Sequence, residues 1–515
     1  MNIYKVLWVD DEIDYLKPHI MFLKDKGYDL TTSTNGQDAL ELAKNNRFDV
    51  ILLDENMPGL NGLETLGELK KINTSTPVIM ITKNEAEHIM DDAIGRKISD
   101  YLIKPVNPNQ ILLSLKRILT TKTLVEEKTI ESYQKEFGKL SDLLLNLKSA
   151  DDWIDYYNKM IYWELELDSL NDQMMFEIYQ NQIKEANLLF SSFIENNYSN
   201  WIKSSDTPTL SNNLFKRKII PFINENKNSI LLIIDNLRLD QWKTITPLIQ
   251  DYFDIISDES YFSILPTATQ YSRNSIFSGM TPSQMQSEHP NLWKNDDEKG
   301  GKNIYEYDFL KSQLKRLNSS ISSNYHKITS IESGKNLIKN LNNFKSNDLL
   351  VVVYNFVDMI SHSKTEMEII KELAPDNKGY RSLILSWFKN SPLFELIQIA
   401  AKLDFNLIIT TDHGTTNVKK PTIIQGKKET STNLRYKFGR SMTYEKDKVV
   451  EVKNPMEYGL PNTHLDSSFI FAKSDHYFIF SNNYNHYANL YNNSFQHGGV
   501  SLEEMIIPFA TLTPR

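Results

Sequence analysis

Short apolar runs separated by amphipathic stretches fill the first 119 residues of the chain. The runs YKVLWV, DVILLD, PVIMIT and DYLIKP each have the length of one buried strand, and the segments between them carry apolar residues at helical spacing. This alternation is typical of a parallel sheet that is covered by helices. The pattern predicts a self-contained α/β domain over residues 1–119.

The pattern changes between residues 120 and 205. No proline occurs between Pro108 and Pro208, and apolar residues recur at helical spacing in LSDLLLNLK, WIDYYNKMIYWELEL and MMFEIYQNQIKEANLLF. Because proline interrupts helices and this spacing places apolar side chains on one face, we predict a small helical bundle that links two larger domains.

Strand and helix patterns alternate again in residues 206–515, after the linker-like segment SSDTP. The runs SILLIIDN, DLLVVVYNFVD and FNLIITTDHG are candidate central strands of a second α/β domain. The stretch from about residue 415 to residue 495 is rich in Lys, Asn, Tyr and Gly. It predicts a cap insertion in this domain rather than more central sheet.

The composition of the chain limits the kinds of site that it can form. The chain has no cysteine, which excludes disulfides and cysteine-ligated zinc, so any metal must be held by His and carboxylates. The formal net charge of −9 is spread along the chain and argues against a general nucleic-acid coat. The start MNIYKVLWVD lacks a cleavable signal pattern, and no apolar run approaches the ~20 residues that span a bilayer. We therefore expect a cytoplasmic protein without membrane insertion.

Five polar residues follow the predicted strands of the first domain: Asp10, Asp11, Asp54, Thr82 and Lys104. The carboxyl ends of parallel strands meet at one crevice, so these side chains are expected to lie together. Three carboxylates there predict a Mg²⁺ site. In this arrangement Asp54 is the nucleophile that takes up a phosphoryl group, Lys104 pairs with that group, and Thr82 bonds one of its oxygens. The alternative is that acidic residues merely end strands in solvated loops.

The same residues resemble the receiver family of two-component response regulators. The resemblance includes the Met-Pro-Gly segment 57–59, the Lys104-Pro105 pair and Tyr101 at the aromatic switch position. It implies a flavodoxin-like fold, phosphorylation of Asp54 and a sensor histidine kinase as partner. It also implies that phosphorylation moves Thr82 and Tyr101, with a homodimer as the expected result.

A second set of acidic and imidazole side chains lies at the carboxyl ends of predicted strands in the C-terminal domain. They are Asp235, Asp358, His362 at i+4 from Asp358, Asp412, His413 and His497. Side chains from separate strands can share one crevice, which here has room for two metals. Without thiolates this donor set favours zinc, with manganese as the second choice.

The segment ILPTATQYSRNSIFSGM lies between the first and second of these ligand strands. Thr269 is expected just before a helix start, where its hydroxyl lies next to free backbone N–H groups, and the amide of Gln270 is a candidate donor to a phosphoryl oxygen. Thr267 is the rival nucleophile. Arg238, Arg273 and Asn274 are candidates for substrate binding, or else polar residues of a helix surface.

These motifs resemble the alkaline phosphatase superfamily, and within it the PglZ branch. The matching pieces are Asp235, the PTAT segment, the Asp358 to His362 pair, the Asp412-His413-Gly414 triplet and HGGVSLEEMIIPF. The resemblance implies two zinc ions per chain and Thr269 as the nucleophile between them. One zinc would be held by Asp358, His362 and His497, and the other by Asp235, Asp412 and His413.

The predicted cap carries a local run of positive charge in an otherwise acidic chain. Its cations are Lys419, Lys420, Lys427, Lys428, Arg435, Lys437 and Arg440. Interleaved with Tyr436 and Phe438, they predict a surface that tracks a polyanionic substrate, or else a solvated hairpin. His289 and His464 are interpreted as ordinary loop residues.

The order of receiver, helical linker and PglZ domain resembles the PorX-like response regulators of the Bacteroidetes, which are associated with type IX secretion. The resemblance implies a zinc-dependent phosphodiesterase acting on nucleotide or oligonucleotide phosphodiesters. No helix-turn-helix output domain is evident, so direct binding to promoter DNA is not expected. The alternative is a metal-stabilised docking module that contacts a transcription or secretion component without turnover.

Overall fold

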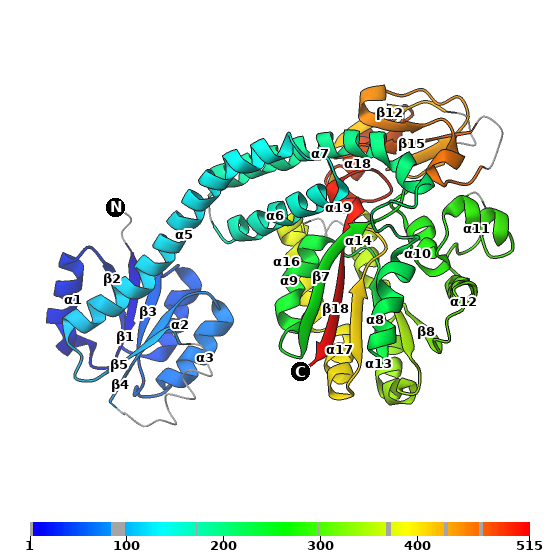
Figure 1. Cartoon of the computed structure of the whole chain (residues 1–515). Coiled ribbons are helices and arrows are strands. Elements are labelled where there is room, and N and C mark those ends of the chain that lie inside the picture. Colours follow the sequence, from blue (N-terminus) through cyan, green and yellow to red (C-terminus); the bar gives the residue numbers. More distant parts are fainter. Residues whose placement is uncertain are drawn as a thin grey trace. The chain divides into compact units, whose positions relative to one another are not determined.

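The fold is known from a computed structural model of the chain (Figure 1). The structure describes residues 4–83, 98–170, 172–296, 298–366, 372–426, 431–462 and 467–515, and the side chains of these residues except 120–125 and 362–366. The chain forms two compact units, Met1–Lys135 and Glu136–Arg515. Each unit is described by itself below.

The first unit contains a parallel five-stranded sheet in the order β2-β1-β3-β4-β5. The central strands are buried because their runs are continuously apolar, as expected for a sheet with helices on both faces. Since this strand order is that of flavodoxin-like folds, the predicted fold of the first domain is confirmed. Its elements are β1 (Lys5–Val9), α1 (Lys17–Asp25), β2 (Asp29–Ser33), α2 (Gly36–Asn45), β3 (Val50–Asp54), α3 (Gly62–Ile72), β4 (Val78–Thr82) and β5 (Asp100–Ile103).

Three long helices follow: α5 (Pro108–Leu144), α6 (Ala150–Asp168) and α7 (Gln173–Lys203). Helix α5 is continuous through residue 119, so the predicted boundary at residues 119 and 120 falls inside a helix. The side chain of Ser149 caps α6 and that of Asp172 caps α7, because short polar side chains can accept from the free N–H groups of a first turn. Helices α6 and α7 belong to the same compact unit as the C-terminal sheet.

A six-stranded sheet in the order β7-β18-β10-β6-β9-β8 forms the centre of the second unit. Strands β8, β9, β6 and β10 are mutually parallel, whereas β18 runs antiparallel to both β10 and β7. The three predicted central strands lie side by side here as β6, β9 and β10. The sheet consists of β6 (Ser229–Ile234), β7 (Phe253–Phe262), β8 (Ser323–Ile328), β9 (Leu349–Tyr354), β10 (Asn406–Thr410) and β18 (Ile506–Pro514).

Helices surround this sheet, and α16 packs against both α9 and α17. No helix in the described residues is long and apolar enough to cross a membrane. The helices of the unit are α8 (Ile220–Glu225), α9 (Leu239–Ile249), α10 (Thr269–Ser278), α11 (Pro282–Glu288), α12 (Glu306–Arg316), α13 (Ile331–Asn340), α14 (Phe356–Glu366), α16 (Asn377–Lys389), α17 (Pro392–Lys402), α18 (Tyr484–Tyr491) and α19 (Leu502–Met505).

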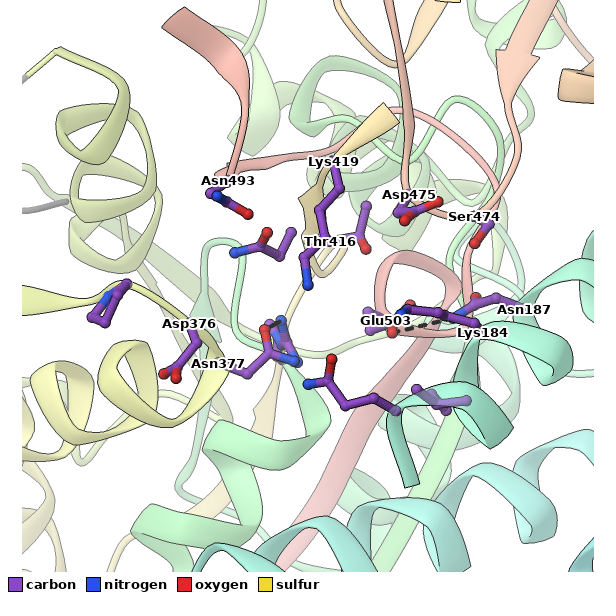
Figure 2. A pocket seen from close by; sticks show the side chains of 15 residues that line it. Lys184, Asn187, Asp376, Asn377, Thr416, Lys419, Ser474, Asp475, Asn493 and Glu503 are labelled. Atoms are coloured by element: carbon purple, nitrogen blue, oxygen red, sulfur yellow. Dashed lines mark hydrogen bonds between the residues drawn. The ribbon is translucent and has the colours of Figure 1, made fainter. Parts of the chain in front are cut away.

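The predicted cap forms small sheets of its own, separate from the central sheet. It consists of β11 (Thr416–Val418), β12 (Lys420–Ile424), β13 (Tyr436–Gly439), β14 (Val449–Val452), β15 (Ser468–Ala472), β16 (His476–Phe480) and β17 (Ser494–Gln496). Figure 1 shows the cap beside α7, and ion pairs from Lys203 to Glu457 and from Lys473 to Glu195 join the two. A polar cavity lies between α7, the start of α16 and the cap (Figure 2).

Candidate active site

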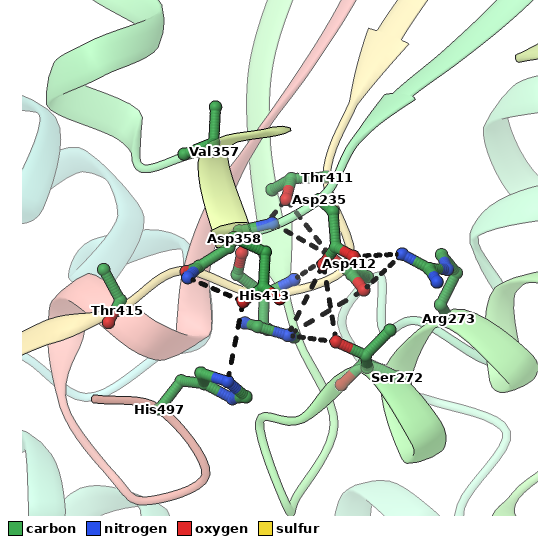
Figure 3. Close-up of polar contacts among 12 residues, drawn as sticks. Asp235, Ser272, Arg273, Val357, Asp358, Thr411, Asp412, His413, Thr415 and His497 are labelled. Carbon is green, nitrogen blue, oxygen red and sulfur yellow. Dashed lines mark hydrogen bonds and ion pairs between the residues drawn. The ribbon is translucent and has the colours of Figure 1, made fainter. Parts of the chain in front are cut away.

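The ends of two neighbouring parallel strands bring three predicted ligands together. Asp235 directly follows β6, and Asp412 and His413 follow β10 after one residue. One ligand atom from each residue lies within 4.8 Å of the other two. The Nε2 atom of His413 is 3.9 Å from Oδ1 of Asp235 and 3.8 Å from Oδ2 of Asp412. Figure 3 shows these side chains converging on one point.

The backbone fixes the orientation of His413. Its Nδ1 atom lies 3.0 Å from the carbonyl oxygen of Gly414, which leaves Nε2 directed at the carboxylates, the arrangement usual for a metal-bound imidazole. Burial lowers the pKa of His413 and so favours the neutral ring that can ligate a metal. At Gly414 a Cβ atom would lie 2.0 Å from the carbonyl oxygen of Glu503, so this close approach requires glycine.

The electrostatics of the cluster favour a bound cation. Burial raises the pKa of Asp235 to about 7, against the lowering effect of Arg273. Burial also raises the pKa of Asp412. The Oδ2 atom of Asp412 is buried and accepts no hydrogen bond from the described residues, although Nη1 of Arg273 is 3.6 Å away. Two buried carboxylates and one imidazole are a donor set that fits a divalent ion such as zinc.

The second predicted ligand set adjoins the first. The Nε2 atom of His497 lies 3.8 Å from Oδ1 of Asp358, and the ring of His497 stacks on that of His413 with centroids 4.2 Å apart. Asp358 lies in the first turn of α14 rather than at the end of β9, which stops at Tyr354. The prediction that Asp358 ends a strand was therefore wrong. The side chain of His362 is outside the described residues.

The turn that carries His497 depends on Thr267. The Nδ1 atom of His497 lies 3.0 Å from the carbonyl oxygen of Thr267. The Thr267 hydroxyl donates to the carbonyl of Gly499 at 2.9 Å and accepts from the N–H of Gly498 at 3.0 Å. Gly498 has φ +118°, a conformation that favours glycine. Thr267 is fully buried, so its hydroxyl holds this turn together.

Thr269 occupies a different environment. It is the first residue of α10, with Ala268 as the N-cap, and it is partly exposed. Its Oγ1 atom lies 3.0 Å from Nε2 of His413 and 3.4 Å from Oδ1 of Asp235. The first-turn N–H groups next to it have no partner within the helix. The geometry therefore favours Thr269 over Thr267 as the nucleophile.

Arg273 connects the ligand cluster to a residue that the sequence did not single out. Its Nη1 donates to Oδ2 of Asp235 at 2.6 Å, and its Nε donates to Oε1 of Glu306 at 2.6 Å. Glu306, at the start of α12, is buried and also accepts from the hydroxyl of Tyr325. A buried Arg requires a carboxylate partner. The sequence therefore indicates that a buried Arg273 needs an acidic partner, but it does not indicate that Glu306 is that partner.

The other predicted substrate contacts have protein partners. Arg238 is buried and donates to both carboxylate oxygens of Asp240 and to Asn377. The side chain of Gln270 donates to the carbonyl of Lys294, and that of Asn274 donates to the carbonyl of Lys302. Arg273 thus bonds to a predicted metal ligand, whereas Arg238 bonds to Asp240 and Asn377.

The predicted positive surface of the cap is smaller than its sequence suggested. Arg435 is buried and donates to both oxygens of Glu504. Lys437 is buried, donates to two backbone carbonyls and lies over the ring of Phe480, and burial lowers its pKa to about 7. Arg435 thus joins the cap to α19 and Lys437 bonds within the cap, so neither is available to a polyanion, and this part of the prediction was wrong. Lys427 and Lys428, like His464, lie outside the described residues.

In the first unit the predicted acidic pocket is formed. Ligand atoms of Asp10, Asp11 and Asp54 lie within 4.8 Å of one another. The Nζ atom of Lys104 is 2.9 Å from both Oδ2 of Asp10 and Oδ1 of Asp54. Burial raises the pKa of Asp54 to about 6, against the lowering effect of its hydrogen bond from Lys104. The donors suit a hard cation such as Mg²⁺.

The two predicted switch residues point elsewhere. The hydroxyl of Thr82 donates to the carboxylate of Glu55, the residue that follows Asp54. Tyr101 is 39% exposed. Glu55, which the sequence did not single out, thus contacts one of the two predicted switch residues.

Comparison with known proteins identifies three families along the chain. Residues 214–512 match the model of the BREX system PglZ alkaline phosphatase-like domain. Residues 6–116 match the response regulator receiver domain, and residues 123–202 match the PorX response regulator linker domain. The predicted order of receiver, linker and PglZ domain is confirmed by these matches.

Individual relatives match over the receiver. The transcriptional regulatory protein ZraR of Klebsiella oxytoca is 33% identical over 137 residues, which is 27% of this chain and 31% of that protein. The response regulator SaeR of Staphylococcus aureus is 32% identical over 145 residues, which is 28% of this chain and 61% of that protein. The chain thus covers less than two thirds of either relative. Among solved structures, the chemotaxis protein CheY4 of Vibrio cholerae is 33% identical with a TM-score of 0.22, covering 23% of this chain and 100% of that one.

Proposed function

This chain belongs to the family of PglZ alkaline phosphatase-like proteins, and from that premise we propose that it is a response regulator whose effector is a zinc-dependent phosphodiesterase. The proposed substrates are nucleotide or oligonucleotide phosphodiesters, and the proposed nucleophile is Thr269. The observation that carries the proposal is the position of the Thr269 hydroxyl, 3.0 Å from Nε2 of His413 and 3.4 Å from Oδ1 of Asp235. A site that only stabilises the fold would not need this hydroxyl.

Zinc held by the two ligand sets would supply a Lewis acid, which lowers the pKa of the Thr269 hydroxyl and offsets charge on the phosphoryl oxygens. The first-turn amides of α10, including that of Gln270, are placed to donate to a phosphoryl oxygen. Arg273 holds Asp235 in position while Glu306 holds Arg273. These contacts fix the direction of the attacking oxygen before substrate arrives.

The reaction proceeds in two displacements. In the first, Oγ1 of Thr269 bonds to phosphorus, one ester P–O bond breaks, and the departing oxygen takes up a proton. In the second, water attacks the phosphothreonine, the bond from Thr269 to phosphorus breaks, and the hydroxyl regains its proton as a phosphomonoester leaves. The two steps together hydrolyse one phosphodiester bond.

The direct test is turnover beside metal content. The full chain is assayed with an aryl phosphodiester and with an aryl phosphomonoester, each as purified, after chelation and after zinc is added back. We expect diester hydrolysis that is lost on chelation and restored by zinc. A zinc-loaded protein that hydrolyses neither ester would instead support the alternative, a metal-stabilised docking module that contacts a transcription or secretion component.

Control by phosphorylation is the second part of the proposal. A sensor histidine kinase would phosphorylate Asp54 with Mg²⁺ bound at Asp10 and Asp11, and the linker helices would carry the change to the effector. The phosphorylated chain would form a homodimer, and its output would regulate type IX secretion.

The Asp54→Ala variant tests whether phosphorylation and dimerisation depend on Asp54. A small phosphodonor with Mg²⁺ is expected to label the wild-type chain once and to shift it from monomer to dimer, measured by intact mass and by sedimentation. Asp54→Ala should show neither change, because Asp54, at the end of β3 and 2.9 Å from Lys104, is the phosphoryl acceptor that the receiver resemblance implies. Asp100→Ala, which alters another acidic residue of the same sheet, is the matched control and should be labelled normally. Stoichiometric labelling of Asp54→Ala would contradict the assignment.

A further inference from the structure

The polar cavity beside α7 is formed by three separate parts of the second unit (Figure 2). Helix α7 supplies one wall, the start of α16 a second, and the cap a third. Its volume is about 100 Å³, and it lies outside the candidate active site. Of its lining residues only Ile183 and Pro375 are apolar, so the cavity suits a polar ligand or water.

The carboxylates of the cavity already have partners. Asp376 caps α16 by accepting from the N–H of Gly379 at 2.8 Å. Asp475 pairs with Lys420 at 3.1 Å. Glu503 accepts two hydrogen bonds of 3.2 Å from the side chain of Asn187, and burial raises its pKa. Each of these carboxylates thus accepts a hydrogen bond or an ion pair from another group of the protein.

Two lysines of the cavity differ from these carboxylates, because no ion-pair partner lies beside them among the described residues. Lys184 on α7 and Lys419 after β11 line it from opposite walls, and Figure 2 shows both side chains reaching toward the space between them. Within the part of the chain that the structure describes, neither ammonium group has an ion-pair partner, unlike Lys420. Arg238, also in the lining, is neutralised by Asp240. The two lysines therefore place two positive charges at a polar cavity whose three carboxylates are held by other groups of the protein.

Side-chain amides lie around these two lysines. Asn417 and Asn493 lie on the cap side, and Asn377 lies on the α16 side. The Oδ1 atom of Asn417 is buried without a hydrogen-bond partner among the described residues. Amides and ammonium groups together can donate to several oxygens of one small anion.

We propose that this cavity is a second ligand site that binds a phosphate group between Lys184 and Lys419. The volume corresponds to roughly three water molecules of liquid, which suits a phosphate group and is too small to enclose a whole nucleotide. The ligand is inorganic phosphate or the terminal phosphate of a nucleotide whose remainder extends outward. Because α7, the catalytic domain and the cap all line the site, a bound phosphate would connect the linker helix to the elements around the metal centre.

Short backbone segments connect the cavity to the candidate active site. Arg238 lies three residues after Asp235, and Thr416 lies three residues after His413. Both line the cavity. Occupancy would therefore stiffen the segments that immediately follow two of the proposed metal ligands.

Calorimetric titration of the zinc-loaded full chain with inorganic phosphate tests the proposal, and a parallel titration with adenosine 5′-monophosphate distinguishes the two sources of phosphate. The variant is Lys184→Met together with Lys419→Met. We expect wild type to bind one more phosphate per chain than the variant, or the variant to bind that phosphate about tenfold more weakly or worse, because hydrogen bonds from charged donors are lost. Both lysines are exposed, so the variant should fold normally.

The matched control is Lys203→Met together with Lys446→Met, which removes one exposed lysine from the same helix and one from the cap, both outside the cavity lining. It should bind phosphate as wild type does. Binding is read without turnover, so the outcome does not depend on the proposed activity. Lysine-dependent binding of the nucleotide alone would identify the nucleotide phosphate as the ligand. Equal stoichiometry and affinity in wild type and the Lys184, Lys419 variant, or an equal loss in the control, would overturn the proposal.

Discussion

Thr269→Ala is expected to keep the zinc content of the wild-type protein while its phosphodiesterase turnover falls by about 10²-fold or more. The substitution removes the oxygen that attacks phosphorus but leaves all six predicted ligands in place. Thr269 is partly exposed, and among the described residues its hydroxyl contacts His413 and Asp235, so its loss should cost little stability. Metal analysis and turnover are measured on the same preparation.

Substitution of the ligands should give a different result. Asp358→Ala and His362→Ala are each expected to lose one zinc together with activity, because three protein ligands hold each ion in the proposed arrangement. Thr269→Ser is the conservative control and should retain turnover, since a serine hydroxyl can take the same position. Zinc loss in Thr269→Ala would make Thr269 a structural residue.

Thr267→Ala provides a comparison with the rival nucleophile. Its hydroxyl bonds to both glycines of the turn after His497, so its removal is expected to lower metal retention and stability. Full activity of Thr269→Ala combined with zinc-replete but inactive Thr267→Ala would move the nucleophile to Thr267.

The clustering of the proposed ligands was predictable because the sequence indicates where buried parallel strands end. Continuous apolar runs indicate strands buried on both faces, and parallel strands present their carboxyl ends at one edge. Asp235, Asp412 and His413 come together for that reason. Asp358 was placed correctly near this edge but in the wrong element, because VVVYNFV reads as one apolar run although the strand ends at Tyr354 and a helix begins at Phe356.

Pairs between distant charged residues were not predictable. Arg435 and Glu504 are 69 positions apart in the chain, and no local pattern distinguishes a buried Arg with a partner from one on a solvated hairpin. The same holds for Arg273 with Glu306. Burial of charge depends on which carboxylate the fold brings near, and that information lies in the tertiary structure.

Another cluster of buried charges joins the linker helices to the PglZ domain. Arg381 on α16 donates at 2.6 Å to Glu164 on α6 and at 2.6 Å to Asp240 on α9, and it also pairs with Asp168. The side chains of Arg381, Glu164 and Asp240 are 4%, 5% and 1% exposed. Asp240 is shared with Arg238, so one cation of the cluster lies on each side of this carboxylate.

Arg381→Met is expected to lower the free energy of unfolding of the second unit by about 3–5 kcal/mol, the range for removing one partner of a buried ion pair. The loss arises because the buried Glu164 and the partly buried Asp168 remain without their cation, whereas Asp240 keeps Arg238. Adding Glu164→Gln to Arg381→Met should therefore restore part of the loss, since it removes one of the uncompensated charges.

Denaturant unfolding followed by tryptophan fluorescence measures this change, because Trp153 and Trp163 lie on α6. Lys203→Met, which breaks the exposed pair with Glu457, is the control and should change stability by about 1 kcal/mol or less. A similarly small effect of Arg381→Met would mean that the cluster does not hold the linker helices to the catalytic domain, and equal stability of the single and double variants would mean that the unpaired Glu164 is not the source of the loss.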